Sequence, residues 1–333
     1  MIKLVFFLLL SVFTAVCCFG QTVSNVDAYQ EGKNIIITYE TDKAGSVGDV
    51  YCSTDGGSTW GVPLKHVTGD VNKQVSAGSH RIVWDVLSER EKLAGANICF
   101  KVEVNSGKFT VNGVSFEMVR VEGGTFRMGA TAEQEDEAMD NEKPVHSVTL
   151  SSYYIGKTEV TQALWQAVMG SNPSNFKGSD LPVECVSWDD CQEFIQKLNS
   201  LTGRNFRLPT EAEWEFACRG GNNSRGYKYS GSNNLGSVAW YDDERGKTHP
   251  VATKAPNELG IYDMSGNVWE WCSDWFEIYT ANSQINPTGP QSGESRVIRG
   301  GSWDYDAWRC RSSVRDGDDP TDRSLILGLR LAL

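Results

Sequence analysis

The sequence predicts an α+β chain of low regular content, in which a small β-sandwich precedes a larger domain with few helices and many loops. Residues 22–105 contain β-branched and aromatic runs, and Gly-rich or polar segments separate these runs. After Ser106 the composition shifts to Trp, Gly and Asn, and only three stretches have helical periodicity. A chain of 333 residues has room for both domains, which we place at 22–105 and 112–333.

The first twenty residues have the pattern of a signal peptide. Lys3 precedes an apolar run from Leu4 to Leu10, and small and mixed residues lead to an expected cleavage site near Gln21. The run is short for a bilayer span, so we expect no membrane-spanning helix. Cys17 follows a valine, whereas lipidation would require a small residue there. We therefore expect a secreted or periplasmic protein, which includes a protein associated with the cell surface.

Three runs in residues 22–105 are predicted strands: Asn34–Tyr39, His80–Trp84 and Ile98–Val104. Their spacing is typical of a small sandwich of the immunoglobulin or fibronectin kind. Between them, Ser53–Trp60 resembles the Asp-box hairpin of sialidase propellers, in which the Asp caps turn amides and the Trp packs beneath the hairpin. A propeller needs repeated blades, so a single copy indicates a structural hairpin and no sialidase.

Three helices are predicted in the larger domain. Ser187 and Asp190 form a capping box before an apolar stripe. Thr210 and Glu213 form a second box, and a Gly-Gly pair follows that helix. A third helix is expected from Thr161 to Met169, and Gly170 is expected to end it. The remainder is expected to form short strands and long loops filled by Trp and Tyr.

The charge of the chain excludes several partners. It has 31 Lys and Arg against 43 Asp and Glu, a net charge of -12, and loss of Lys3 with the signal peptide makes the balance more acidic. Without a basic run, nucleic acid is not expected as a partner. The acidic segment Glu133–Glu142 is expected to be a solvated surface turn.

Cysteine usage favours disulfides and excludes a zinc cluster. No C-x-x-C pair occurs after the signal peptide, and the four histidines are scattered. Export favours disulfides, and an odd number of cysteines leaves at least one thiol free. Cys52 and Cys99, each on a predicted strand, are one expected pair. The cysteines of the mature chain are Cys52, Cys99, Cys185, Cys191, Cys218, Cys272 and Cys310.

Eight sequence blocks, in one order, resemble the formylglycine-generating enzyme family, also called sulfatase-modifying factors. Together they span residues 112–333. The blocks are Met118–Gly129, Pro144–Val148, Tyr154–Thr161, Pro182–Trp188, Arg207–Glu215, Asn257–Trp271, Arg299–Trp303 and Leu327–Arg330. The resemblance implies a mixed domain of low regular content, related in architecture to C-type lectin domains.

The resemblance also implies a structural calcium site. The family's ligands, two side chains and two backbone carbonyls, match Asp263, Gly266, Val268 and Glu270. Carboxylate and carbonyl oxygens around a sharp turn are what Ca²⁺ prefers. The alternative is that Asp263 and Glu270 only cap the turn.

The family's catalysis depends on two cysteines that bind Cu(I), and the resemblance implies that this chain lacks both. Tyr305 stands where the first cysteine is expected, and the segment that would carry the second is shortened. No copper is expected, because two thiolates are needed to hold Cu(I). Cys310 matches a structural cysteine of the family, whose disulfide partner matches Cys218. The family's other disulfide maps to Ile195 and Leu331, which suit an apolar contact.

Two functions remain open from the sequence. The first is a pseudoenzyme that binds a peptide, protein or glycan outside the cytoplasm, or acts as a cell-surface scaffold; its candidate ligand-binding residues are Trp269, Ser302, Trp303 and Tyr305. The alternative role of each Trp is core packing. The second is an oxidoreductase that modifies a cysteine of exported sulfatases by a different route. The family's iron-dependent sulfoxide synthases carry an additional helical, histidine-rich domain, to which nothing here corresponds.

Overall fold

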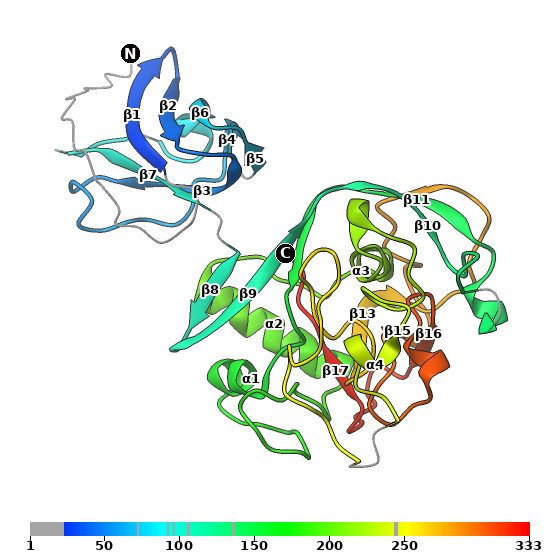
Figure 1. The fold of residues 1–333 in the computed structure, drawn as a ribbon. Coiled ribbons are helices and arrows are strands. Elements are labelled where there is room, and N and C mark those ends of the chain that lie inside the picture. The colour runs from blue at the N-terminus through cyan, green and yellow to red at the C-terminus, as the bar shows by residue number, and fades with distance from the viewer. Residues whose placement is uncertain are drawn as a thin grey trace. The chain divides into compact units, whose positions relative to one another are not determined.

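A computed structural model describes residues 23–333 except 72, 92, 96, 105–106, 135–136 and 243–245. The chain forms two compact units, residues 1–106 and 107–333 (Figure 1). The expected signal peptide lies outside the described residues. Within the described part, none of the helices is long and apolar enough to cross a membrane.

The first unit consists of two antiparallel sheets, with strand orders β1-β2-β6-β4 and β5-β3-β7. Ile37, Val50 and Trp84, which come from both sheets, share one buried core, so the sheets pack face to face as a sandwich. The bounds are β1 (Val23–Glu31), β2 (Asn34–Thr41), β3 (Gly45–Ser53), β4 (Val67–Gly69), β5 (Lys73–Val75), β6 (Gly78–Trp84) and β7 (Cys99–Val104), with the 3-10 helix η1 (Val86–Ser88).

The Asp-box segment of this unit is a capped turn. Asp55 accepts hydrogen bonds from the Thr59 amide (2.9 Å) and hydroxyl (2.6 Å), as the motif predicts. The Trp60 ring is 36% exposed and lies against Gly57 of the same turn, where an added Cβ would come within 3.3 Å of it. The Lys101 ammonium lies 5.5 Å from its ring centroid.

The second unit is mixed and sheet-rich with few helices, which confirms the predicted fold class. Its sheets have the orders β10-β11-β14, β12-β9-β8 and β16-β15-β13-β17. The strands are β8 (Lys108–Val111), β9 (Val114–Val121), β10 (Gly124–Met128), β11 (His146–Leu150), β12 (Tyr153–Gly156), β13 (Trp269–Trp275), β14 (Gln284–Ile285), β15 (Arg296–Arg299), β16 (Arg315–Asp318) and β17 (Leu327–Leu329). The helices are α1 (Gln162–Met169), α2 (Trp188–Thr202), α3 (Glu211–Cys218) and α4 (Leu235–Val238), with 3-10 helices η3 (Asp140–Glu142), η4 (Gly221–Asn223) and η5 (Ala307–Cys310).

The three predicted helices form where their caps are. Thr161, Ser187 and Thr210 are the N-caps of α1, α2 and α3, and the last two make the expected capping boxes. Gly170 ends α1 with φ +80°, a conformation that glycine adopts without a side-chain clash.

Strand β13 organises the core of the second unit. It pairs antiparallel with β15 and parallel with β17, so it lies inside its sheet. Its side chains alternate between two apolar clusters: Trp269 and Trp271 belong to one, and Cys272 belongs to the other. A strand buried on both faces must satisfy every polar side chain it carries, which applies to Glu270 and Asp274.

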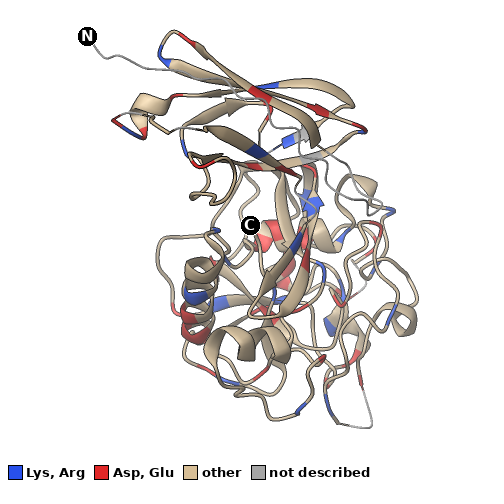
Figure 2. Ribbon diagram, turned by 90° about the vertical axis from the view of Figure 1, so that its left-hand side faces the viewer, with Lys and Arg blue, Asp and Glu red and all other residues tan. Residues whose placement is uncertain are grey.

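Arg330 meets that demand for Glu270, and it is one of four fully or almost fully buried arginines that each pair with a buried carboxylate. The pairs are Arg299–Glu215, Arg311–Glu142, Arg315–Glu211 and Arg330–Glu270. Figure 2 marks the acidic and basic residues along the chain.

One of these pairs corrects an expectation from the sequence. Glu142 was expected in a solvated turn, but it is fully buried and bonded to the Arg311 guanidinium at 2.7 and 2.9 Å. Within the same segment, Glu133 pairs with Arg219 at 2.6 Å. The described part of this acidic segment is therefore anchored to the core by arginines distant in sequence.

Candidate functional site

The four residues predicted to contact a ligand lie together in the structure. Trp269 opens β13, and Ser302, Trp303 and Tyr305 form the turn after β15. The Tyr305 ring packs edge-on against Trp269, with 6.0 Å between centroids. Hence a local turn and a central strand build the site.

The turn needs glycine at Gly301. Its φ is +74°, and a Cβ there would lie 2.8 Å from the Arg309 carbonyl oxygen and 2.9 Å from Cys310 Sγ. This close approach places the turn against η5. Any larger residue at position 301 would clash with that helix.

Burial divides the four residues. Trp269, Ser302 and Trp303 are 1%, 0% and 6% exposed, whereas Tyr305 is partly exposed. The Trp303 indole stacks edge-on against Phe176 at 5.8 Å and donates to the Leu325 carbonyl. Ser302 Oγ is buried and has no hydrogen-bond partner among the described residues. Of these four residues, Tyr305 is therefore the one with a side chain open to solvent.

Charged side chains of both signs surround Tyr305. Asp304 and Asp306, its neighbours in sequence, are exposed. The Arg309 guanidinium lies 4.8 Å from the Tyr305 ring centroid and pairs with Asp316 at 3.1 Å. An aromatic ring with carboxylates and a guanidinium beside it suits polar peptide or sugar groups.

The thiol closest in sequence to this turn is not poised for chemistry. Cys310 is fully buried, and burial raises its pKa to about 12. Burial likewise raises the pKa of Cys218 to about 11. The thiolate is the metal-binding form of cysteine, so burial disfavours metal binding by either sulfur when it is reduced.

The predicted calcium ligands surround a sharp turn between Asp263 and Glu270. Asp263 has φ +58°, and its Oδ2 accepts from the Ala252 amide at 2.7 Å. Gly266 has φ +80°, and a Cβ there would lie 2.2 Å from the Trp240 carbonyl oxygen. The turn therefore needs glycine at this position.

The electrostatics of this turn fit a cation at Asp263 better than at Glu270. Asp263 Oδ1 is buried without a hydrogen bond among the described residues. Glu270 instead accepts from Trp214 Nε1 (2.6 Å) and from the Arg330 guanidinium (2.6 and 2.9 Å). A third carboxylate, Glu159, is fully buried nearby; burial first, then Asp263 and Glu270, raise its pKa well above the usual range.

Glu159, Asp263 and Glu270 thus lie near one guanidinium, that of Arg330, and a divalent cation would stabilise the ionised forms of Glu159 and Asp263. The sequence pattern does not single out Glu159, although it lies in the motif block Tyr154–Thr161. In the described part of the chain, no three His, Cys, Asp or Glu residues form a metal-binding group. The predicted calcium site differs from such a group, because it takes two side chains and two backbone carbonyls.

Calcium is expected to stabilise the second unit through Asp263. At a hundred times its dissociation constant, a bound ion adds about 2.7 kcal/mol to the free energy of unfolding. We expect EGTA to lower the melting temperature of the wild type and to have no effect on Asp263→Asn. The exposed Glu294→Gln serves as control and should keep the calcium response. A wild-type melting temperature that EGTA leaves unchanged would show that the site is wrong.

The side chain of Asp274 is expected to make the free energy of unfolding depend on pH. Burial, and then the negative charge of Glu211, raise the pKa of Asp274 from 3.8 to about 7. The folded state therefore keeps a proton that the unfolded state releases near pH 4, and stability falls as pH rises. Between pH 5 and 7 this group should cost about 2 kcal/mol. In urea titrations, the free energy of unfolding of Asp274→Asn should not fall in this way between pH 5 and 7. If the free energies of both proteins change in parallel with pH, the raised pKa of Asp274 is wrong.

Comparison with known proteins identifies the second unit. Residues 106–333 match the family described as sulfatase-modifying factor enzyme 1-like domain. The chaperone protein LppX of Paenibacillus barcinonensis is 36% identical over 262 residues, covering 63% of this chain and 84% of that protein. The formylglycine-generating enzyme of Streptomyces coelicolor is 32% identical over 283 residues, covering 64% and 88%. The chain therefore belongs to the sulfatase-modifying factor, or formylglycine-generating enzyme, family.

Solved structures agree with this assignment. Treponema denticola variable protein 1 superposes with a TM-score of 0.61 at 37% identity, covering 68% of this chain and 97% of that one. PvdO from Pseudomonas aeruginosa gives a TM-score of 0.56 at 25% identity, with the same coverage. The family thus includes proteins named as enzymes and proteins named otherwise.

Proposed function

We propose that this chain is an exported, non-catalytic member of its family that binds a peptide, protein or glycan at the surface around Tyr305. The observation that carries the proposal is the replacement of the expected catalytic cysteine by Tyr305, a partly exposed ring beside the buried, unpartnered Ser302 hydroxyl. A partly exposed aromatic ring in a turn that packs on the core favours binding.

Two further points support a binding role. Cys310, the cysteine that follows the turn, is buried, and burial disfavours the thiolate that copper or oxygen chemistry would need. One relative is named a chaperone, which favours a protein or peptide as ligand. Export is inferred from the N-terminal leader, residues 1–20.

Removal of the Tyr305 ring is the test of this proposal. The mature wild type is first applied to peptide and glycan arrays, and its strongest binder is then titrated against Tyr305→Ala. We expect the variant to bind at least about fivefold more weakly, equivalent to about 1 kcal/mol, with its melting temperature nearly unchanged because the ring is partly exposed. Tyr29→Ala, an exposed tyrosine of the first unit, is the control and should bind as the wild type does.

Two outcomes would contradict the proposal. A large fall in melting temperature for Tyr305→Ala would assign the ring to the core. Formylglycine detected by mass spectrometry, after incubation of the wild type with Cu(I) and a C-x-P-x-R sulfatase peptide, would establish the alternative oxidoreductase. Trp303→Ala is unsuitable as a binding probe, since its buried indole contributes to folding.

A further inference from the structure

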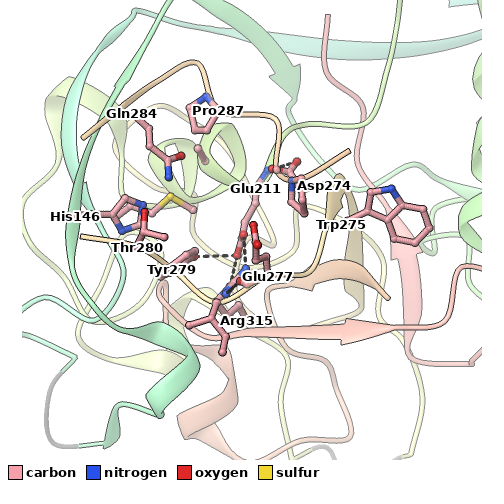
Figure 3. A pocket seen from close by; sticks show the side chains of 15 residues that line it. His146, Glu211, Asp274, Trp275, Glu277, Tyr279, Thr280, Gln284, Pro287 and Arg315 are labelled. Carbon is pink, nitrogen blue, oxygen red and sulfur yellow. Dashed lines mark hydrogen bonds and ion pairs between the residues drawn. The ribbon is translucent and has the colours of Figure 1, made fainter. Parts of the chain in front are cut away.

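A second candidate site is a pocket of about 80 Å³ beside the N-terminus of α3. Its polar lining comes from β11, α3, β13, β16 and the segment 276–290, and Figure 3 shows these side chains converging from different elements. Neither Tyr305 nor any predicted calcium ligand lines it. The polar residues concerned are His146, Glu211, Asp274, Tyr279, Gln284 and Arg315.

Part of this lining is structural. Arg315 pairs with Glu211 through two hydrogen bonds of 2.6 and 2.8 Å, and the Tyr279 hydroxyl donates to the same carboxylate at 2.9 Å. These bonds satisfy the Glu211 oxygens and fix one wall of the pocket (Figure 3).

Two other buried side chains keep a polar atom without a partner. Asp274 is 4% exposed, and both of its hydrogen bonds, from the Glu211 amide (3.0 Å) and the Ser273 hydroxyl (2.9 Å), go to Oδ2. His146 is 2% exposed, and its Nδ1 lies 3.1 Å from the Pro144 carbonyl oxygen. Among the described residues, Asp274 Oδ1 and His146 Nε2 therefore remain as hydrogen-bond acceptors in the pocket lining.

The remaining lining is acidic and apolar. The acidic lining residues are Glu211, Asp274 and Glu277. Glu211 is paired with Arg315, which also lines the pocket, and lies 3.7 Å from the Arg299 guanidinium. An anion is thus disfavoured beside Asp274 and Glu277, and a bound cation would stabilise the ionised form of Asp274 over the protonated form that burial favours. Among the apolar lining residues is Ile278, which is 71% exposed at the rim. Ile285, adjacent to the pocket residue Gln284, is 78% exposed.

We propose that this pocket binds a primary alkylammonium group on an apolar stem, as found in a lysine side chain or a free alkylamine. The ammonium donates to Asp274 Oδ1, and His146 Nε2 is the second acceptor available. The stem packs against Met128 and Ile278, as alkyl chains of lysine commonly do. The small volume favours the compact ammonium over a planar guanidinium.

The test uses the mature full chain and Nα-acetyl-lysine methylamide, titrated by saturation-transfer NMR. Acetylation of the ligand's Nε removes the charge and should weaken binding at least about tenfold, as loss of a charged hydrogen bond does. Asp274→Asn keeps an acceptor for the Glu211 amide, so it should fold and yet bind at least about tenfold more weakly. Asp180→Asn, an exposed carboxylate outside the pocket, should bind as the wild type does.

A rim variant and a second ligand complete the design. Ile278→Ser, at a highly exposed position, should fold normally and weaken binding about threefold through the lost stem contact. If n-butylamine binds as tightly as the lysine derivative, the ligand is a free alkylamine. If n-butylamine binds more weakly, the ligand is a lysine side chain of a peptide. The proposal is overturned if both lysine derivatives bind alike, if folded Asp274→Asn binds like the wild type, or if Ile278→Ser has no effect.

Discussion

Replacement of Arg311 by leucine is expected to lower the free energy of unfolding by about 3 to 5 kcal/mol, because it leaves a buried carboxylate without its counter-ion. Arg311 and Glu142 are both fully buried, and the guanidinium binds the carboxylate through two hydrogen bonds. Among the described residues, the Glu142 carboxylate would keep the Ser313 hydroxyl and the Met139 amide as its donors. Urea unfolding of the two proteins, followed by tryptophan fluorescence, measures the difference.

Two controls separate this effect from loss of side-chain packing. Arg323→Leu removes an exposed partner of Asp190 and should cost less than about 1 kcal/mol. The double replacement Arg311→Leu with Glu142→Leu removes both charges and should be more stable than Arg311→Leu alone. If Arg311→Leu costs no more than Arg323→Leu, the buried pair does not anchor the acidic segment.

The burial of Glu142 could not be predicted from the sequence. A run of acids is usually solvated, and within 133–142 nothing indicates otherwise. Its partner Arg311 lies 169 residues further along the chain, so only the folded topology brings the two together. Helix starts behave differently: the hydroxyls of Thr161, Ser187 and Thr210 cap amides within three residues, and that signal is local.

The same distinction applies to the sheets. The runs that became β2 and β6 could be predicted because their β-branched and aromatic residues carry the signal within each strand. The parallel pairing of Trp269 with Leu327 in β13 and β17 could not be, since register depends on contacts across 58 residues.

For the candidate site, motif resemblance predicted which residues meet but not which of them face solvent. Trp269, Ser302, Trp303 and Tyr305 do lie together, yet an aromatic residue in a Gly-rich turn can point either way. The pocket at Asp274 had no sequence signal, because its walls come from five separate parts of the second unit. Burial and convergence of this kind are properties of the folded chain.

A disulfide between Cys218 and Cys310 is the second large effect we expect. The family resemblance predicts the pair, and the structure has both sulfurs as free, buried thiols. Their backbones share one hydrogen-bonded chain: Ser230 Oγ donates to the Cys218 carbonyl (2.9 Å), Ser265 Oγ donates to the Cys310 carbonyl (2.8 Å), and the Ser230 amide donates to Ser265 Oγ (3.2 Å). The two cysteines therefore belong to one neighbourhood of the core.

The bond would close a loop of roughly ninety residues, for which chain entropy gives about 4 to 5 kcal/mol as an upper figure. In protein exported to an oxidising compartment, non-reducing peptide mapping should recover Cys218 and Cys310 in one linked peptide pair. Reducing agent should lower the free energy of unfolding of this protein, and it should have no such effect on the double variant Cys218→Ala with Cys310→Ala, whose stability should match that of the reduced wild type. A peptide map in which Cys310 is alkylated without prior reduction would exclude the bond.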